Sequence, residues 1–384
     1  MKKLISLVLA LVLCLAAFSV VAEGEAKVKV GFIFLHDENS TYDLNFINAA
    51  KEACDKLGVD CVLKTGIPED QLCYETAADL ADSGCNIVFA DSFGHEDYMI
   101  QAAKEFPEVE FCHATGTKAH TEGMDNYHNA FASIYEGRYL TGVAAGMKLA
   151  EIMGDAEPIV GYVGALPYAE VISGYSAFYL GVTSIVPEAK MFVTFTGSWY
   201  DETAEKEAAM ALMEKGAIVI SAHADSMGMP TACEARGVPF VAYNGSFKAA
   251  CPNTYIISTR INWAPYIKYC IESIQNGTPI AADWVGTIET GSVEMCELND
   301  AAAAKGTKTA LKDITWQFAA GLHVFDVSKF TFEGENITSY MADVDSDANY
   351  TPDTEVVSDG YFHESEYRSA PYFDIAIDGI TVLS

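Results

Sequence analysis

Residues 84–94 read GCNIVFADSFG and residues 216–228 read GAIVISAHADSMG, so the chain contains two versions of one short stretch. Each version starts with a glycine after a helix-like run, continues as an apolar segment, and ends in Asp-Ser-x-Gly before another helix-like run. Open α/β sheets place their ligand sites where a buried strand ends in a polar loop of this kind. Two such loops, one in each half of the chain, predict a single ligand held between two lobes.

The segments around these stretches alternate between strand-like and helix-like patterns, which predicts parallel sheets with helices on both faces. The strands expected in the first half are residues 27–35, 59–64, 87–90 and 109–114. The strands expected in the second half are residues 158–163, 191–195, 218–222 and 238–242. Because the second strand ends in Thr-Gly in both halves, at 65–66 and 196–197, we interpret the halves as structural duplicates.

The domain boundaries follow from where this order begins, repeats and stops. Residues 129–150 form the longest helical pattern and link the halves, and the chain becomes irregular and acidic after residue 324. The aromatic residues of this last part favour packing onto a lobe over disorder. We expect a signal peptide at 1–22, a first lobe at 28–128 plus about 258–280, a second lobe at 129–255 plus about 281–323, and an acidic C-terminal extension at 324–384. Hinge segments are expected near residues 126–131, 255–260 and 281–286.

The first 22 residues have the pattern of a cleaved export signal, in which Lys2 and Lys3 precede an apolar run that ends in Val-Val-Ala. A retained anchor is an alternative, because the apolar run is close to membrane-spanning length. Lipidation of Cys14 is a second alternative, which the leucine before it disfavours. We therefore expect an exported protein, outside the cell or at its surface, with membrane anchoring left open.

The composition argues against nucleic acid as the main partner. The formal net charge is -31, from 23 basic and 54 acidic residues, and it would repel nucleic acids and anionic membrane surfaces. The chain has ten cysteines, one of which is Cys14, and no C-x-x-C pair. Zinc and redox motifs are therefore absent, whereas disulfide formation stays open for an exported protein.

Sequence motifs that would identify an enzyme are missing. The chain has no G-x-S-x-G elbow, P-loop, G-x-G-x-x-G or H-E-x-x-H motif. The pairs His223 with Asp225 and His95 with Asp97 lack further ligands at the spacing of known metal sites. Neither a metal nor a cofactor is therefore expected. A nucleoside hydrolase that uses Asp91 or Asp225 as a base stays open as the enzymatic alternative.

The candidate ligand site consists of polar and aromatic residues that follow the expected strands. Because the carboxyl ends of parallel strands converge on one cleft in a two-lobed α/β protein, these loops should meet. Aromatic faces suit a flat heterocycle such as a purine, and carboxylates suit ring N–H groups or sugar hydroxyls. The residues predicted to bind the ligand are Tyr42, Asp43, Phe46, Ser92, Phe93, Gly94, Tyr168, Trp199, Asp225 and Asn244.

Several of these residues also have a structural explanation. Asp91 and Ser92 fit as caps of the helix that follows them, because Asp and Ser favour that position. Asp225 is less easily explained as a cap, since its next helix begins several residues later. Phe46 fits the inner face of a helix as well as it fits a ligand contact, and Asn244 fits a turn.

Six runs of the chain match one protein family. They are NIVFADSFGHEDYMIQAAKEFPEVEFCHATG (86–116), YEGRYLTGVAAGMK (135–148), GYVGALPYAEVISGYSAFYLG (161–181), GSWYDETAEKEAA (197–209), AHADS (222–226) and VAYN (241–244). In these runs the chain resembles the basic membrane protein family of ABC-transporter solute-binding proteins, which includes the purine nucleoside receptor of spirochaetes. The match covers roughly residues 28–298, although the first loop, HDENSTYDLNF (36–46), departs from the glycine-rich loop of many relatives.

The resemblance implies a type I periplasmic-binding-protein fold, in which two doubly wound parallel-sheet lobes are joined by a hinge. It also implies an ABC-transporter ligand, a purine nucleobase or nucleoside, that is stacked between aromatic rings and handed to permease subunits in the membrane. By position, Phe93, Trp199, Asp225 and Asn244 match cleft residues of the family. We therefore expect a solute-binding protein whose lobes close around the ligand. A ligand-sensing receptor subunit for another small molecule stays open as an alternative.

Overall fold

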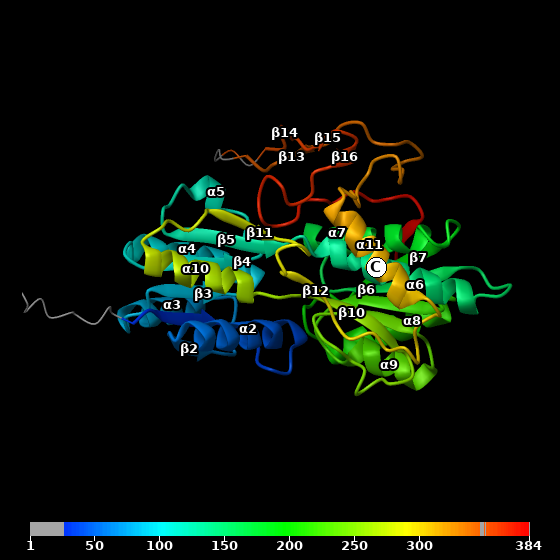
Figure 1. Ribbon diagram of the computed structural model, residues 1–384, viewed down its shortest axis with the longest axis horizontal. Coiled ribbons are helices and arrows are strands. Elements are labelled where there is room, and N and C mark those ends of the chain that lie inside the picture. Colours follow the sequence, from blue (N-terminus) through cyan, green and yellow to red (C-terminus); the bar gives the residue numbers. More distant parts are fainter. Residues whose placement is uncertain (1–26, 346–348, 350, 384) are drawn as a thin grey trace, which may run out of the picture.

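The computed structural model describes residues 27–345, 349 and 351–383. The expected signal peptide and Cys14 lie outside the described residues. The chain forms two lobes side by side, each a central sheet covered by helices (Figure 1). The predicted fold class, two α/β lobes with mostly parallel sheets, is confirmed.

The first lobe is built on a sheet with the strand order β2-β1-β3-β4-β5-β11, in which all neighbours pair in parallel. Its strands are β1 (Lys29–Ile33), β2 (Asp60–Lys64), β3 (Ile87–Ala90), β4 (Glu110–Ala114), β5 (Tyr127–Ala132) and β11 (Asp283–Gly286). Its helices are α2 (Thr41–Leu57), α3 (Gln71–Asp82), α4 (Glu96–Glu105), α5 (Ala119–Glu122) and α10 (Ala264–Asn276). Helices α2 and α10 pack together over one buried cluster, while α3 and α4 cover another.

The second lobe repeats this plan with the strand order β12-β10-β9-β8-β6-β7-β17. Its strands are β6 (Ile159–Gly164), β7 (Lys190–Phe195), β8 (Val219–His223), β9 (Phe240–Tyr243), β10 (Tyr255–Ile261), β12 (Val293–Met295) and β17 (Ile380–Val382). Its helices are α6 (Ile134–Ile152), α7 (Ala169–Thr183), α8 (Glu202–Glu214), α9 (Gly228–Arg236) and α11 (Thr307–Ala319). Because β6 to β10 take the places of β1 to β5, the two lobes are structural duplicates. The Thr-Gly landmarks end in Gly66 and Gly197, whose positive φ angles of 70° and 78° suit glycine in these turns.

The lobe boundaries differ by a few residues from those expected. Residues 127–132 form β5 of the first sheet, so the long helix begins at Ile134 rather than at residue 129. Strand β10 lies wholly in the second sheet, and β11 lies in the first. Strand β5 was not predicted because it contains polar residues, which are buried with hydrogen-bond partners in the fold. His128 Nε2 lies 2.8 Å from Glu110 Oε2, and Asn129 Oδ1 accepts from Ala119 N at 2.7 Å. The chain consequently crosses between lobes at residues 133, 262–263 and 287–292, slightly after the expected hinge segments.

The C-terminal extension packs on the second lobe. The rings of Phe325 and Phe373 stack with centroids 4.1 Å apart, and both belong to the buried cluster beneath α6 and α7. At the end of the chain, β17 pairs in parallel with β7 at the sheet edge. The other strands of the C-terminal extension are β13 (Met341–Ala342), β14 (Thr354–Glu355), β15 (Val357–Ser358) and β16 (Tyr361–Phe362). The extension lies over the upper side of the second lobe in Figure 1 and reaches towards the first.

Two further features bear on the expected class of protein. Within the described part of the chain, no helix is long and apolar enough to cross a membrane. The nine cysteines there are all free thiols, and seven of them are buried.

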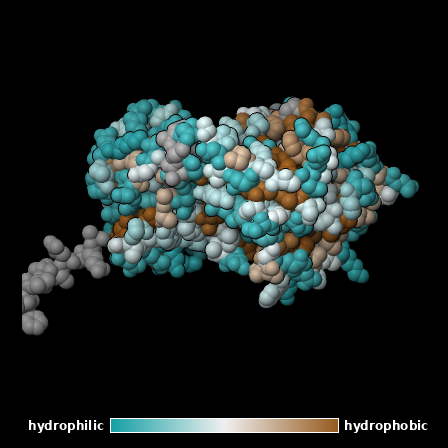
Figure 2. Space-filling view, turned by 90° about the horizontal axis from the view of Figure 1, so that it is seen from above, coloured by the Kyte–Doolittle hydropathy of each residue, from teal (hydrophilic) through white to brown (hydrophobic). Residues whose placement is uncertain are grey.

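Seen from above, a waist separates the lobes, and hydrophobic residues gather on the larger, second lobe (Figure 2).

Candidate functional site

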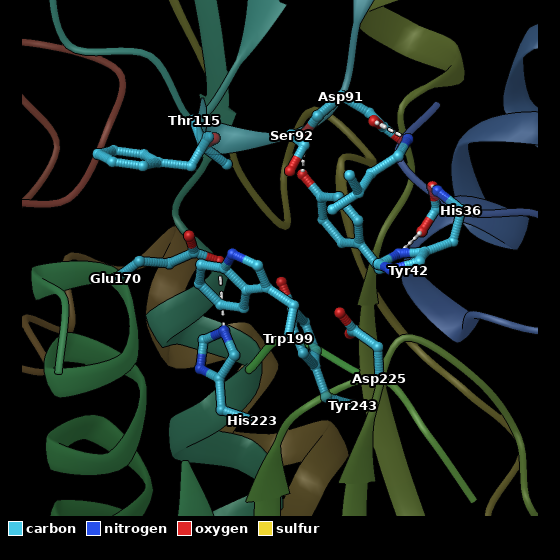
Figure 3. Close-up of a pocket in the computed structure, with 13 residues that line it drawn as sticks. His36, Tyr42, Asp91, Ser92, Thr115, Glu170, Trp199, His223, Asp225 and Tyr243 are labelled. Carbon is cyan, nitrogen blue, oxygen red and sulfur yellow. Dashed lines mark hydrogen bonds and ion pairs between the residues drawn. The ribbon is translucent and has the colours of Figure 1, made fainter. Parts of the chain in front are cut away.

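A pocket lies between the two lobes, at the carboxyl ends of strands from both sheets (Figure 3). We call it the inner pocket, and its cavity volume is about 30 Å³. Residues from the first lobe that line it are Leu35, His36, Tyr42, Asp43, Asp91, Ser92, Phe93 and Thr115. Residues from the second lobe that line it are Glu170, Trp199, His223, Asp225 and Tyr243. The loops that follow equivalent strands therefore meet, as the strand-to-loop pattern predicts.

Asp91 faces this pocket and does not cap the following helix. The N-cap position of α4 is occupied by His95, without a side-chain hydrogen bond. Asp91 Oδ1 accepts from Leu35 N at 3.1 Å, whereas its fully buried Oδ2 has no hydrogen-bond partner among the described residues. Burial, with a smaller contribution from the charge of Asp43, raises the pKa of Asp91 well above its ordinary value. The capping interpretation of Asp91 was wrong, and its carboxyl is available to a ligand.

Helix α2 presents one predicted residue to the pocket and buries another. Tyr42 lines the pocket and donates its hydroxyl to the carbonyl oxygen of Asp91 at 2.8 Å. Phe46, one helical turn later, is 0% exposed and stacks on Trp263 with centroids 4.2 Å apart. Phe46 therefore belongs to the core of the first lobe, and its predicted ligand contact is corrected.

Asp43 lines the pocket, but its carboxylate already holds the first loop in place. Its Oδ1 accepts from His36 N at 2.8 Å, and its Oδ2 accepts from Ser40 Oγ at 2.6 Å. Although burial opposes ionisation, the hydrogen bonds from His36 and Ser40 keep the pKa of Asp43 below its ordinary value. Asp43 is thus an ionised group that shapes the pocket wall.

Ser92 and Gly94 both contact Glu69 at the edge of the site. Ser92 Oγ donates to Glu69 Oε1 at 2.6 Å, and Gly94 N donates to the same oxygen at 2.7 Å. A Cβ atom at Gly94 would lie 2.6 Å from Glu69 Cδ, so only glycine allows this approach. Ser92 lines the inner pocket, whereas Gly94 does not. The role of Gly94 is therefore to position the loop, which corrects its predicted ligand contact.

Aromatic residues from both lobes form a row at the mouth of the cleft. The rings of Phe93, from the first lobe, and Tyr168, from the second, have centroids 5.1 Å apart. Tyr168 and Trp199 follow at 6.0 Å. Trp199 lines the inner pocket, and Phe93 lines both it and an outer cavity to which Tyr168 contributes. These rings provide the apolar faces expected for a flat ligand.

Asp225 supplies a second buried carboxyl from the opposite wall. Burial, with a smaller contribution from the charge of Asp43, raises the pKa of Asp225 well above its ordinary value. Its backbone oxygen accepts from Thr41 N at 3.2 Å across the cleft. Asn244 does not line the inner pocket, and its Oδ1 accepts from Asn45 Nδ2 at 3.4 Å between the lobes. Its buried Nδ2 has no hydrogen-bond partner among the described residues, so the ligand role of Asn244 stays a prediction.

Sequence reasoning missed a polar cluster beneath the second-lobe wall. Glu170 Oε1 lies 3.2 Å from His223 Nε2, and the buried guanidinium of Arg138 lies 3.9 Å from the ring centroid of Tyr243. Burial raises the pKa of Glu170 to about 7, although Arg138 opposes this shift. Burial and the charge of Arg138 lower the pKa of His223, so the imidazole is neutral. Within the residues described, no group of three or more His, Cys, Asp or Glu side chains could hold a metal.

Two duplicated α/β lobes, crossed by hinge segments and enclosing one pocket at their strand ends, define a periplasmic-type solute-binding protein. Residues 33–317 match the Bmp family, described as ABC transporter substrate-binding protein, PnrA-like. The chain therefore belongs to this family of ABC-transporter solute-binding proteins, whose members bind a solute and are not enzymes.

Individual proteins agree with this assignment. The chain is 32% identical over 262 residues to a purine-binding protein of Brucella abortus, and this alignment covers 67% of this chain and 71% of the relative. It is 33% identical over 211 residues to a proposed ABC transporter glucose-binding protein, TsgA13 of Haloferax volcanii, and this alignment covers 55% of this chain and 51% of the relative. The structure of an ABC transporter solute-binding protein from Conexibacter woesei matches with a TM-score of 0.64 at 23% identity, over 77% of this chain and 98% of that one.

Proposed function

We propose that the protein binds a purine nucleobase or nucleoside between its lobes for import by an ABC transporter. The observation that carries this proposal is the pair of buried carboxyl groups, Asp91 and Asp225, which face one pocket from opposite lobes. Ring N–H groups of a purine can donate to carboxyl oxygens on two sides. Trp199 and Tyr42 offer aromatic faces beside them.

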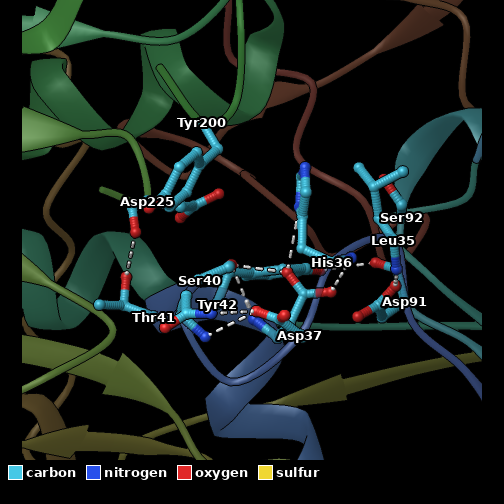
Figure 4. Close-up of polar contacts among 12 residues, drawn as sticks. Leu35, His36, Asp37, Ser40, Thr41, Tyr42, Asp91, Ser92, Tyr200 and Asp225 are labelled. Carbon is cyan, nitrogen blue, oxygen red and sulfur yellow. Dashed lines mark hydrogen bonds and ion pairs between the residues drawn. The ribbon is translucent and has the colours of Figure 1, made fainter. Parts of the chain in front are cut away.

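Binding then couples to closure of the lobes. Thr41 N and Oγ1 both contact the backbone oxygen of Asp225 across the cleft, at 3.2 and 3.3 Å (Figure 4). A ligand that touches both lobes binds the closed form better than the open form, and it therefore shifts the population towards closure. The closed form is the one we expect permease subunits to receive. We also propose that the mature protein is exported after cleavage at residue 22 and works outside the cytoplasmic membrane.

A hexose is the second candidate ligand. Carboxyl groups also accept from sugar hydroxyls, and one relative carries the name of a proposed glucose-binding protein. The pocket walls favour the purine, because Tyr42, Trp199 and Tyr243 present three aromatic rings while first-lobe hydroxyl donors such as Ser92 are already bonded.

Calorimetric titration of the full mature chain with hypoxanthine, inosine and glucose tests this proposal. We expect binding of a purine compound and no heat from glucose. In a thermal-shift measurement, a ligand at 100 times its Kd should stabilise the protein by about 2.7 kcal/mol. Binding of glucose without binding of any purine base or nucleoside would replace the proposal with the hexose alternative.

A further inference from the structure

A larger outer cavity continues the cleft beyond the inner pocket. Its volume is about 390 Å³, which lies in the range of small-molecule sites. It shares Phe93, Thr115 and Glu170 with the inner pocket, so the two spaces are neighbours in one cleft. Its other lining residues are Thr117, Pro167, Tyr168, Ala169, Ile172, Arg368, Ala370, Pro371 and Asp374.

The C-terminal extension builds one wall of this outer cavity. Arg368, Ala370, Pro371 and Asp374 all belong to the extension, which lies beyond the residues that match the family, 33–317. The wall is held by bonds to both lobes. Ser369 N and Oγ donate to Asp283 Oδ1 in β11 of the first lobe, at 2.8 and 2.6 Å. The flanking Phe362 and Phe373 are buried in the second lobe.

Arg368 is fixed in this wall by the backbone around it. Its Nη1 donates to the carbonyl oxygen of Asp343 at 3.1 Å, and its Nε donates to that of Ala370 at 3.3 Å. Its guanidinium also lies 5.6 Å from the ring centroid of Tyr372. Its Nη2 also donates to the carbonyl oxygen of Pro371 at 3.5 Å. A guanidinium carries five N–H donors, so two N–H groups beyond these three bonds are left for another acceptor.

The charges around the outer cavity favour a neutral, hydroxyl-bearing group. Among the described residues that line either space, Arg368 is the only lysine or arginine, and the carboxyl groups of Glu170 and Asp374 share the outer cavity with it. A hydroxyl can accept from the guanidinium and donate to a carboxylate at the same time. A phosphate would face both carboxyl groups and the net charge of -31 on the chain.

We propose that the outer cavity is the subsite for the pentose of a nucleoside, and that the C-terminal extension completes it through Arg368. The inference rests on the proposed purine function, and it selects the nucleoside over the free nucleobase. The base would lie between Asp91 and Asp225, and the sugar would pass between Phe93 and Glu170 into the outer cavity. Because the inner pocket measures only about 30 Å³ in this arrangement, its two walls must move apart to admit the base. The extension thereby gives this chain a specificity determinant beyond the residues that match the family.

The experiment compares the affinities of inosine, hypoxanthine and inosine monophosphate by calorimetry on the full mature chain. The wild type should bind inosine more tightly than hypoxanthine or the monophosphate. Arg368→Gln should weaken inosine binding about tenfold, because it removes a hydrogen bond from a charged donor. Hypoxanthine affinity should change less than twofold.

A second variant tests the subsite by its size and does not disturb the bonds of Arg368. Ala370 is buried in the cavity wall, so Ala370→Leu should fill part of the cavity and weaken inosine at least as much as Arg368→Gln. Asp359→Asn is the matched control, since Asp359 is exposed in the same extension at a φ of 51° that asparagine adopts readily. This control should leave all three affinities unchanged.

Each result separates the inference from the function on which it rests. Equal affinities of the wild type for inosine and hypoxanthine would overturn the inference and leave the purine function standing. The same holds if both cavity variants weaken the two compounds equally. Tighter binding of the monophosphate than of inosine would overturn the assignment of a neutral sugar. Absence of binding to every purine compound would instead overturn the proposed function itself.

Discussion

Buried carboxyl groups are costly for a protein, because burial disfavours their charged form. Asp91 and Asp225 are buried on opposite sides of the inner pocket, and both pKa values are raised. A ligand with N–H donors could supply a hydrogen bond to Asp91 Oδ2, which has none among the described residues. The empty site therefore has an unfavourable free energy, and binding of a ligand with matching donors lowers it.

Trp199 is the residue where the aromatic part of this argument is tested. Trp199→Ala should weaken binding of a purine ligand by about 1–2 kcal/mol, since stacking on an aromatic ring of this size is lost. Calorimetry at neutral pH measures the change directly. Trp316→Ala provides the control, because Trp316 is 70% exposed on α11 and does not line either cavity. Equal losses in both variants would show that Trp199 acts only on stability.

At the scale of residues, the sequence predicts those groups that immediately follow a strand and misses those that depend on distant partners. Trp199 and Asp225 were placed correctly in the inner pocket, because strand ends of both lobes converge there. The sequence left open whether Asp91 caps a helix or presents a free carboxyl, since both follow from the same local pattern. Glu170 gave no local signal at all, because its partner His223 lies 53 positions away.

The C-terminal extension is an element whose attachment depends on a buried acid. Glu364 is 2% exposed, and its Oε1 accepts from Ser173 Oγ of α7 at 2.5 Å. Burial raises the pKa of Glu364 from 4.5 to about 7. Between these two values the folded state holds a proton that the unfolded chain has released. The free energy of unfolding therefore falls as the pH rises from about 4.5 to about 7.

Glu364→Gln should remove this part of the pH dependence. Between pH 4.5 and pH 8, the wild type should lose on the order of 1–3 kcal/mol more unfolding free energy than the variant. Urea unfolding at a series of pH values measures both curves. Glu335→Gln, an exposed glutamate of the same extension, controls for the change in net charge. If the Glu364→Gln curve parallels that of the wild type, the buried acid does not contribute to the pH dependence.

At the scale of elements, the alternation of strands and helices was enough to predict the sheets. It did not predict strand β5 or the position of the C-terminal extension. Strand β5 reads as polar because its His128 and Asn129 are buried with hydrogen-bond partners that only the fold provides. The extension carries little periodicity, so its aromatic residues indicated packing without indicating where. Its pairing of β17 with β7 joins segments almost 190 positions apart.

In the whole molecule, the two lobes contact each other on more than one side of the cleft. Thr41 contacts Asp225 on the side of α2, while Ser369 of the extension contacts Asp283 near the outer cavity. Opening must break the Ser369 contact, because the extension is anchored in the second lobe and Asp283 belongs to the first. The extension therefore holds the lobes together independently of the ligand.

Ser369→Ala should make the ligand leave faster. The variant removes the hydroxyl bond and keeps the backbone bond from Ser369 N, so the closed form loses about 1 kcal/mol. We expect dissociation about fivefold faster in stopped-flow fluorescence, with a smaller change in the association rate. Ser328→Ala removes a hydroxyl from the same extension away from the cleft and should leave the rate unchanged. An unaltered dissociation rate in Ser369→Ala would mean that opening does not pass through this contact.

Residues 365–371 are tethered to the second lobe at both ends, by the buried Phe362 before them and the buried Phe373 after them, and this tethering affects how fast the lobes close again. A short tethered segment meets its target at an effective concentration in the millimolar range, whatever the concentration of the protein. Asp283 thus finds Ser369 again each time the lobes approach. The contact between the lobes forms within a single molecule, so dilution of the protein leaves it intact.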